Sequence, residues 1–114
     1  MYTEISSKEL ETLIKNKADI ELIDVREKNE WDQIRIPGAK LIPLSSIEFR
    51  ISDIDFSKPI YVFCRTGGRS GRVCAWLEWQ GKSATNVAGS IAALYRDQSD
   101  IIEITDAFRP SYFN

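Results

Sequence analysis

The chain has 114 residues, 43% of them hydrophobic, and this length and composition indicate one folded domain with a single core rather than disorder. Its net charge of −2 provides no basic excess, so we expect no non-specific nucleic-acid binding, and no apolar run is long enough to span a membrane. The N-terminal residues lack a secretory signal and two cysteines are too few for a disulfide framework, so we expect a cytoplasmic protein with reduced thiols.

Histidine does not occur in the chain, and its absence narrows the possible chemistry. No Cys/His or Ser/His catalytic pair and no histidine metal site can form. Cys64 and Cys74 alone make a poor zinc site, because structural zinc is held by four ligands. We therefore expect neither a metal ion nor another cofactor. A reactive cysteine would owe its thiolate to backbone N–H groups and to arginine.

Strand and helix signals alternate along the first half of the chain. Ser6 and Glu9 have the spacing of a capping box, which marks the start of a helix, and Pro37-Gly38 marks a turn. Apolar runs and helical periodicity assign the remaining elements. In chain order we predict a helix over 7–16, a buried strand over 20–25, a short helix over 27–34, a short strand over 40–42 and a helix over 44–54.

The second half continues this alternation, which predicts an α/β fold with a parallel sheet and helices on both faces. Residues 97–114 break the pattern. We therefore predict one domain over 1–96 and a C-terminal extension that packs back on the same domain or on a partner. The elements predicted here are a strand over 60–64, a Gly-rich loop, a helix over 70–80, a strand over 84–87 and a helix over 89–95.

The segment most suited to chemistry is Cys64-Arg65-Thr66-Gly67-Gly68-Arg69-Ser70, which joins a buried strand to a helix. Adjacent glycines let backbone N–H groups turn inward, and the helix N-terminus adds partial positive charge. The same field lowers the pKa of a thiol. Arg65 and Arg69 would attract an anionic substrate and bind its oxygens. We expect Cys64 to be a nucleophile facing a pocket of inward-pointing N–H groups.

Each of these features has an ordinary structural explanation when it stands alone. A lone cysteine is usually a small buried hydrophobic residue, and a Gly-Gly pair is usually a turn. Their combination at a strand–loop–helix junction favours a functional site. Three further expectations concern single side chains: Cys74 in the helix core, Arg72 facing solvent, and Trp79 packing on the C-terminal extension. For Asp24 and Arg26 the ordinary interpretation is a buried pair, and the alternative is a role in supporting the loop.

Four segments, in order, resemble the rhodanese family and span roughly residues 3–95. They are the loop from Cys64 to Ser70, Leu22–Glu27 followed by Glu30-Trp31, Ile36–Ala39 followed by Ile42–Leu44, and Asn86–Gly89. The chain departs from the family at Arg35, where a histidine is usual. The resemblance implies a rhodanese-like three-layer fold, with a five-stranded parallel sheet and helices on both faces.

The resemblance also implies an activity, that of a sulfurtransferase. Cys64 would attack a sulfane sulfur, as in thiosulfate, and become a persulfide that a thiophile such as cyanide or a thiol then discharges. The backbone amides of Arg65 through Ser70 would hold the persulfide. This makes Cys64 the catalytic residue and assigns substrate binding to the six residues that follow it: Arg65, Thr66, Gly67, Gly68, Arg69 and Ser70.

Two other functions stay open at this point. The chain could be a persulfide carrier or binding module that serves a dedicated protein partner, such as a member of a sulfur relay. It could less readily be a thiolate phosphatase or arsenate reductase. Those enzymes place arginine six positions after the cysteine, where this chain has Ser70. The shorter spacing suits one extra sulfur atom better than a tetrahedral oxyanion.

Overall fold

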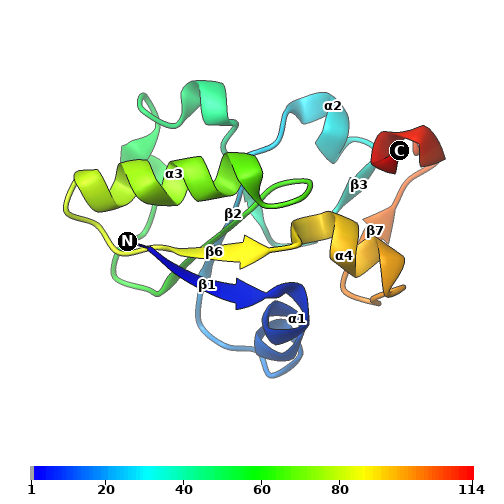
Figure 1. The fold of residues 1–114 in the computed structure, drawn as a ribbon, viewed down its shortest axis with the longest axis horizontal. Coiled ribbons are helices and arrows are strands. Elements are labelled where there is room, and N and C mark those ends of the chain that lie inside the picture. The colour runs from blue at the N-terminus through cyan, green and yellow to red at the C-terminus, as the bar shows by residue number, and fades with distance from the viewer. Residues whose placement is uncertain (1) are drawn as a thin grey trace.

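Five parallel strands form the centre of the fold, in the spatial order β1-β6-β5-β2-β4. Figure 1 labels β1, β6 and β2 of this sheet. The structure is a computed structural model that describes residues 2–114. The five strands are β1 (Thr3–Ser6), β2 (Glu21–Asp24), β4 (Lys40–Leu41), β5 (Ile60–Phe63) and β6 (Thr85–Ala88). The α/β class and the five-stranded parallel sheet are therefore confirmed.

Helices cover both faces of this sheet, and two clusters of buried side chains separate the layers. On one face α3 (Gly68–Trp79) packs with two 3-10 turns, η1 (Leu44–Ser46) and η2 (Ile51–Asp53). On the other face α1 (Ser7–Lys15) packs beside α4 (Ser90–Arg96). A shorter helix, α2 (Lys28–Trp31), follows β2 near the carboxyl edge of the sheet.

The neighbouring inner strands β2 and β5 are covered on both faces, and their side chains alternate between the two clusters. Ile23 and Val62 belong to the cluster under α3, whereas Leu22 and Phe63 belong to the cluster under α1 and α4. This alternation is the period of two expected of a strand. Cys64 continues it, and its side chain lies in the cluster under α3.

The C-terminal segment packs against the body through a second, two-stranded sheet. In it β3 (Ile34–Arg35) pairs antiparallel with β7 (Glu103–Ile104), and the Arg35 Nε to Glu103 Oε1 ion pair measures 2.6 Å. The segment ends in the 3-10 turn η3 (Pro110–Phe113), whose Phe113 stacks on Tyr95 of α4 with ring centroids 4.6 Å apart. These contacts bring the end of the chain back to the carboxyl edge of the main sheet (Figure 1).

The helix predicted over 44–54 is wrong, because this stretch forms the turns η1 and η2 instead. Arg50 breaks the helical path with φ −116° and ψ 18°. Its side chain donates to the Leu41 carbonyl at 3.1 Å and pairs with Asp53 at 2.8 Å. Serine and β-branched isoleucine also have modest helix propensity. The apolar stripe is still buried, since Ile47 and Ile54 enter the core from the turns.

Three other expectations also need correction. The helix predicted over 27–34 ends at Trp31, because Ile34 pairs with Ile104 across the small sheet. β1 has no counterpart among the predicted strands, since it is an edge strand whose polar residues carry no apolar signal. Trp79 is 88% exposed, so it does not pack on the C-terminal extension. Within residues 2–114, no helix combines the length and apolar character needed to cross a bilayer.

Candidate active site

Cys64 directly follows β5 at the carboxyl edge of the sheet, where parallel α/β folds bind ligands. Its backbone N–H donates to the Ser90 hydroxyl at 3.1 Å, and its carbonyl accepts the N–H of Ile91 at 3.2 Å. The next carbonyl, that of Arg65, accepts the N–H of Ala92 at 2.9 Å. The first turn of α4 therefore holds the start of the loop in place.

The loop then turns its N–H groups toward the sulfur, as the adjacent glycines predict. Gly67 has φ +112°, a conformation that side-chain-bearing residues rarely adopt. Its N–H donates to Cys64 Sγ at 3.1 Å, and the N–H of Ser70 donates at 3.4 Å. The Ser70 hydroxyl oxygen lies 3.3 Å from the same sulfur. The first turn of α3 and the Ser70 side chain therefore surround one sulfur atom with donors.

These donors determine how Cys64 ionises. Burial by itself raises the pKa of the thiol, but the hydrogen bonds from the Ser70 hydroxyl and from the amides of Ser70 and Gly67 outweigh it, so the pKa lies below its ordinary value. Cys74 shows the opposite behaviour, because burial raises its pKa to about 12. Cys74 lies in the core under α3, as predicted, and stays a thiol when Cys64 becomes a thiolate.

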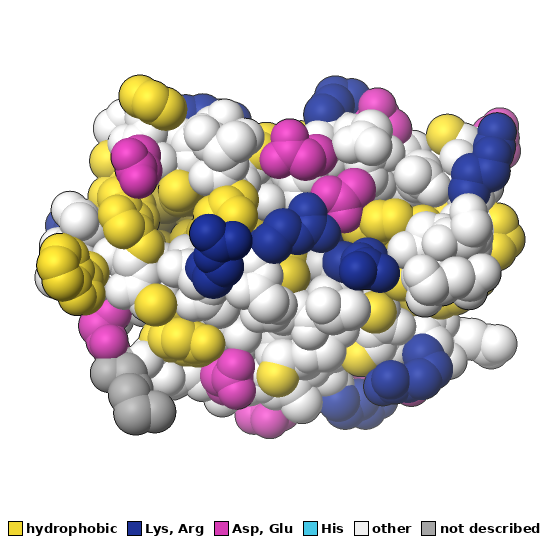
Figure 2. All heavy atoms as spheres, turned by 45° about the horizontal axis from the view of Figure 1, so that its top comes forward, with side chains coloured by type: hydrophobic (Ala, Val, Ile, Leu, Met, Phe, Trp, Pro, Cys, Tyr) yellow, Lys and Arg dark blue, Asp and Glu magenta, His cyan; other side chains and the backbone are white. Residues whose placement is uncertain are grey.

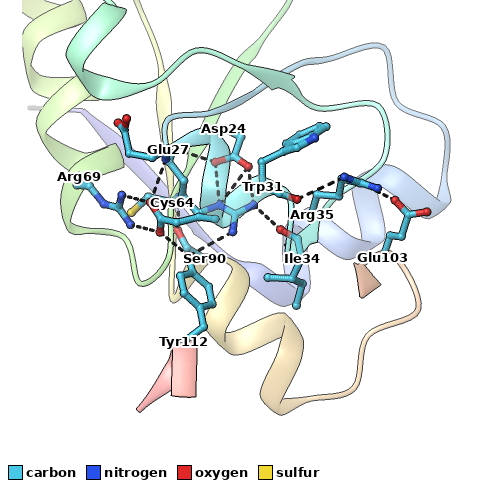
Figure 3. A network of polar contacts seen from close by, with 12 residues as sticks. Asp24, Glu27, Trp31, Ile34, Arg35, Cys64, Arg69, Ser90, Glu103 and Tyr112 are labelled. Carbon is cyan, nitrogen blue, oxygen red and sulfur yellow. Dashed lines mark hydrogen bonds and ion pairs between the residues drawn. The ribbon is translucent and has the colours of Figure 1, made fainter. Parts of the chain in front are cut away.

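Arg69 points its guanidinium at a carboxylate of the protein itself. Its Nη1 and Nη2 bind the two carboxylate oxygens of Glu30 at 2.7 and 2.8 Å (Figure 3). Glu30 also accepts the Tyr112 hydroxyl at 2.6 Å. Burial by itself raises the pKa of Glu30. The hydrogen bonds from Arg69, the Glu27 backbone and Tyr112 outweigh burial and lower the pKa to about 2. In the structure the Arg69 guanidinium is therefore paired with Glu30, and its contact with an anionic substrate stays a prediction.

Arg26 and Asp24 form the predicted buried pair behind the loop. Both side chains are 0% exposed, and Arg26 Nη2 lies 2.8 Å from Asp24 Oδ2. The same nitrogen donates to the Ile34 carbonyl at 2.7 Å, and Nη1 donates to the Tyr112 hydroxyl at 3.2 Å. Because Asp24 pairs with Phe63 in the sheet register, the pair lies beside the start of the Cys64 loop. A chain of hydrogen bonds connects the pair through Tyr112 and Glu30 to Arg69 of the loop, and a supporting role stays a prediction.

The remaining loop residues lie on the outer side of the turn. Thr66 and Gly68 are exposed, and Arg65 is partly buried. Arg65 Nη1 approaches the Tyr112 carbonyl at 3.5 Å, and its guanidinium lies 6.0 Å from the Tyr112 ring centroid. Arg72 is exposed on α3, in agreement with the sequence-based expectation. Arg65 and Arg69 of the loop therefore both contact protein groups. Tyr112 of the C-terminal segment contacts Arg65 directly and contacts Glu30, the partner of Arg69.

The sulfur itself is covered in this conformation. The donors face the sulfur as expected. Cys64 is only 1% exposed, however, so solvent has almost no access to it. A persulfide adds one sulfur atom, which needs room beside the loop. A donor could reach the sulfur only if side chains beside it moved, at a mouth of the site that the partly buried Arg69, Glu30 and Tyr112 would form. Arg69 and its partners are the partly exposed candidates for that movement.

Three residues of this arrangement have no role in the sequence-based prediction: Glu30, Asn86 and Tyr112. Asn86 of β6 accepts the Ser70 hydroxyl at 2.6 Å and donates to the Gly67 carbonyl at 3.2 Å, so it joins both ends of the cradle. Glu30 and Asn86 lie in the segments that resemble the rhodanese family, which was a usable signal. Tyr112 lies in the extension, where nothing in the sequence points to the site.

Comparison with known families agrees with this geometry. The model of the rhodanese-like domain matches residues 6–97. The chain belongs to the rhodanese-like domain family. The match covers every strand of the main sheet except the first residues of β1, together with the whole Cys64 loop, and it ends before the β7 and η3 segments.

Relatives of this rhodanese-like domain include proteins named for sulfur transfer and for sulfur carriage. A sulfurtransferase of Allochromatium vinosum is 34% identical, over 90% of this chain and 96% of the relative. A putative sulfur carrier protein of Bacillus subtilis, YrkF, is 32% identical, over 74% of this chain but 46% of the relative. A rhodanese-like domain protein from Staphylococcus aureus superimposes with a TM-score of 0.77 at 29% identity, over 91% of this chain and 99% of that one.

Proposed function

We propose that this rhodanese-like domain is a sulfurtransferase in which Cys64 carries sulfane sulfur as a persulfide. One observation carries the proposal: two backbone amides and the Ser70 hydroxyl lie within 3.4 Å of a sulfur atom whose pKa is lowered. A thiolate stabilised by fixed donors needs no histidine base, and the chain has no histidine. The sulfurtransferase relative supports the same reaction class.

In the first half-reaction the Cys64 thiolate attacks the outer sulfur of a sulfane donor such as thiosulfate. A new S–S bond forms at Cys64, the S–S bond of thiosulfate breaks, and sulfite leaves with the bonding electron pair. The negative charge then lies on the terminal sulfur of the persulfide. The amides from Arg65 to Ser70 are proposed to bind that charge, as oxyanion-hole donors bind a charged oxygen.

In the second half-reaction a nucleophile attacks the terminal sulfur. Cyanide or a thiolate forms a bond to it, the S–S bond to Cys64 breaks, and the electron pair returns to Cys64 as thiolate. The donors that favoured the thiolate at the start favour it again as the leaving group. The same loop therefore serves both steps. Thr66 and Gly68, which line its exposed side, are proposed to contact donor and acceptor.

A sulfur carrier that serves a protein partner is the second candidate. The relationship to the putative sulfur carrier protein YrkF and the covered sulfur both favour it, since a partner could open the mouth that a small molecule finds closed. The two candidates share the persulfide and differ in turnover. A transferase cycles quickly with cyanide and thiosulfate, whereas a carrier forms the persulfide and discharges it slowly without its partner.

The persulfide can be tested by intact mass. The reduced protein, incubated with thiosulfate, should gain one sulfur atom, and cyanide should remove it. Cys64→Ser should gain none, whereas the matched variant Cys74→Ser should behave like the unaltered chain, because Cys74 stays a thiol in the core. Hydrolysis of an aryl phosphate without any sulfur uptake would instead point to thiolate phosphatase chemistry and overturn the proposal.

A further inference from the structure

The loop arginine best placed to bind an anion is already engaged. Arg69 uses both terminal nitrogens on the two oxygens of Glu30, at 2.7 and 2.8 Å, and bidentate pairing of this kind is the strongest way a guanidinium binds a carboxylate. The Glu30 side chain is 12% exposed, so the pair is partly shielded from water and from salt. A donor that needs the Arg69 guanidinium must therefore displace a carboxylate that is built into the site.

Tyr112 holds this carboxylate from a second side. Its hydroxyl donates to Glu30 Oε2 at 2.6 Å and accepts from Arg26 Nη1 at 3.2 Å, so both hydrogen-bonding capacities of the hydroxyl are used (Figure 3). The segment that carries Tyr112 is fastened independently, by the stack of Phe113 on Tyr95 and by the small sheet. The C-terminal segment therefore fixes the orientation of Glu30 at the mouth of the site.

The charges around Cys64 consequently pair off. Arg26 is neutralised by Asp24, and Arg69 by Glu30. Among the ion pairs of residues 2–114, Arg65 has no carboxylate partner, but its guanidinium faces the carbonyl of Tyr112. Figure 2 shows the same mixture on the surface, with acidic side chains directly beside the basic side chains near the start of α3. A dianion approaching the thiolate therefore meets one guanidinium without a carboxylate partner, that of Arg65, and one that Glu30 neutralises, rather than two free guanidinium groups.

We propose that Glu30 and Tyr112 are specificity-determining residues. They reduce the use of small dianionic donors such as thiosulfate and favour donors of lower negative charge, in which a thiol compound carries the sulfane sulfur. The preferred donor class is a hydropersulfide, R–S–SH. Cys64 attacks its terminal sulfur, the S–S bond of the donor breaks, and R–S− leaves with the electron pair while Cys64–S–SH keeps the proton. This assignment rests on the proposed sulfur transfer through Cys64.

The charge at the mouth can be measured without any sulfur transfer, through two alkylating agents of nearly equal size. Iodoacetate is an anion and iodoacetamide is neutral, so the ratio of their rates at Cys64 reports the local attraction for anions and cancels changes in thiolate fraction. We expect Glu30→Gln to raise the iodoacetate-to-iodoacetamide ratio about tenfold, because it leaves Arg69 uncompensated. Tyr112→Phe keeps the carboxylate but frees it, and should raise the ratio about twofold to threefold.

Glu27→Gln is the matched control, since it removes a negative charge from the start of the same helix. Its carboxylate is exposed and forms no ion pair within residues 2–114, and the glutamine oxygen can still accept the Glu30 backbone N–H of the capping box. We expect its ratio to stay within about twofold of the unaltered protein. An unchanged ratio in Glu30→Gln and Tyr112→Phe, or an equal rise in Glu27→Gln, would overturn the assignment. Circular dichroism verifies that each variant is folded, and Tyr112→Phe provides the test if Glu30→Gln is not.

The donor preference is then read from sulfur uptake itself. The probes are thiosulfate and the hydropersulfide of N-acetylcysteine amide, which carries at most one negative charge. In Glu30→Gln we expect kcat/KM for thiosulfate to rise about tenfold relative to the persulfide. Sulfur uptake with the same donor ratio in every variant would refute the specificity assignment and leave the proposed function intact. No uptake from either donor by the unaltered protein would refute the proposed function itself.

Discussion

Removal of the Ser70 hydroxyl should raise the pKa of Cys64 and so report directly on the cradle. The hydroxyl oxygen lies 3.3 Å from Sγ, and it is the first of the groups that lower the pKa of this thiol. A hydrogen bond to a charged group contributes about 1.5–3 kcal/mol. One pKa unit corresponds to about 1.4 kcal/mol, so Ser70→Ala should raise the pKa by about one to two units.

The lower end of this range is the expected value. The Ser70 hydroxyl has one proton, and Asn86 Oδ1, at 2.6 Å, competes with the sulfur for it. Sulfur is also a weaker acceptor than oxygen. We therefore expect a rise of about one unit, with the thiolate fraction at a fixed pH below both midpoints falling about tenfold. The sign follows from the charge: the lost donor favoured the thiolate, so a higher pH is needed to form it.

The assay is the rate of iodoacetamide alkylation at Cys64 between about pH 4 and 10, followed by mass of the modified peptide. Its midpoint gives the pKa, whereas a single rate does not, because the intrinsic nucleophilicity of a thiolate rises with its pKa. Cys74 does not interfere, since its pKa is raised to about 12. Thr66→Ala is the control, as it removes an exposed hydroxyl from the same loop.

The reasoning is refuted if the midpoint of Ser70→Ala stays where it lies in the unaltered protein, or if Thr66→Ala shifts it equally. The first result would mean that the backbone amides alone stabilise the thiolate. The second would mean that the loop responds to any substitution. In either case the Ser70 hydroxyl would not be a specific donor to the sulfur.

Three further predictions concern stability. Gly67→Ala should lower the free energy of unfolding by about 1–2 kcal/mol, because Gly67 has φ +112°. Gly68→Ala should be nearly neutral, because an added Cβ there meets open space, and urea denaturation compares the two variants. Glu30 has a pKa of about 2 against an ordinary 4.5, so its contribution to stability is complete above about pH 4.5 and is lost as the pH falls to about 2; a Glu30→Gln variant that loses as much stability over this range as the unaltered protein would contradict this. Trp79→Ser should leave the melting temperature unchanged, since the side chain is 88% exposed, and a clear drop would show an unrecognised packing role.

Much of the fold follows from local patterns that the sequence displays. Buried strands such as Ile60–Phe63 are short apolar runs, and the capping box at Ser6 and Glu9 is present where it was expected. The stretch 44–54 shows the limit of such patterns. Its apolar spacing is correct for burial, but the Arg50 side chain bonds to Leu41 and Asp53, and the backbone leaves the helical path.

The candidate site divides in the same way. The inward-turned amides of Gly67 and Ser70 are a local property, because they and Cys64 lie on one short loop whose glycine permits the turn. The partner of Arg69 is not local. Glu30 lies 39 residues away along the chain, and Tyr112 lies 82 residues from Glu30. No spacing rule connects residues so far apart.

By itself, therefore, the sequence determined the layered α/β architecture and the sulfur-centred loop, since periodicity, glycine and the strand–loop–helix junction act over a few neighbouring residues. Only the tertiary structure decided that Arg69 is neutralised and that the C-terminal segment reaches the mouth of the site. The reason is physical: a guanidinium pairs with whichever carboxylate the folded chain brings within hydrogen-bonding distance, and that choice depends on how β3, β7 and η3 pack together.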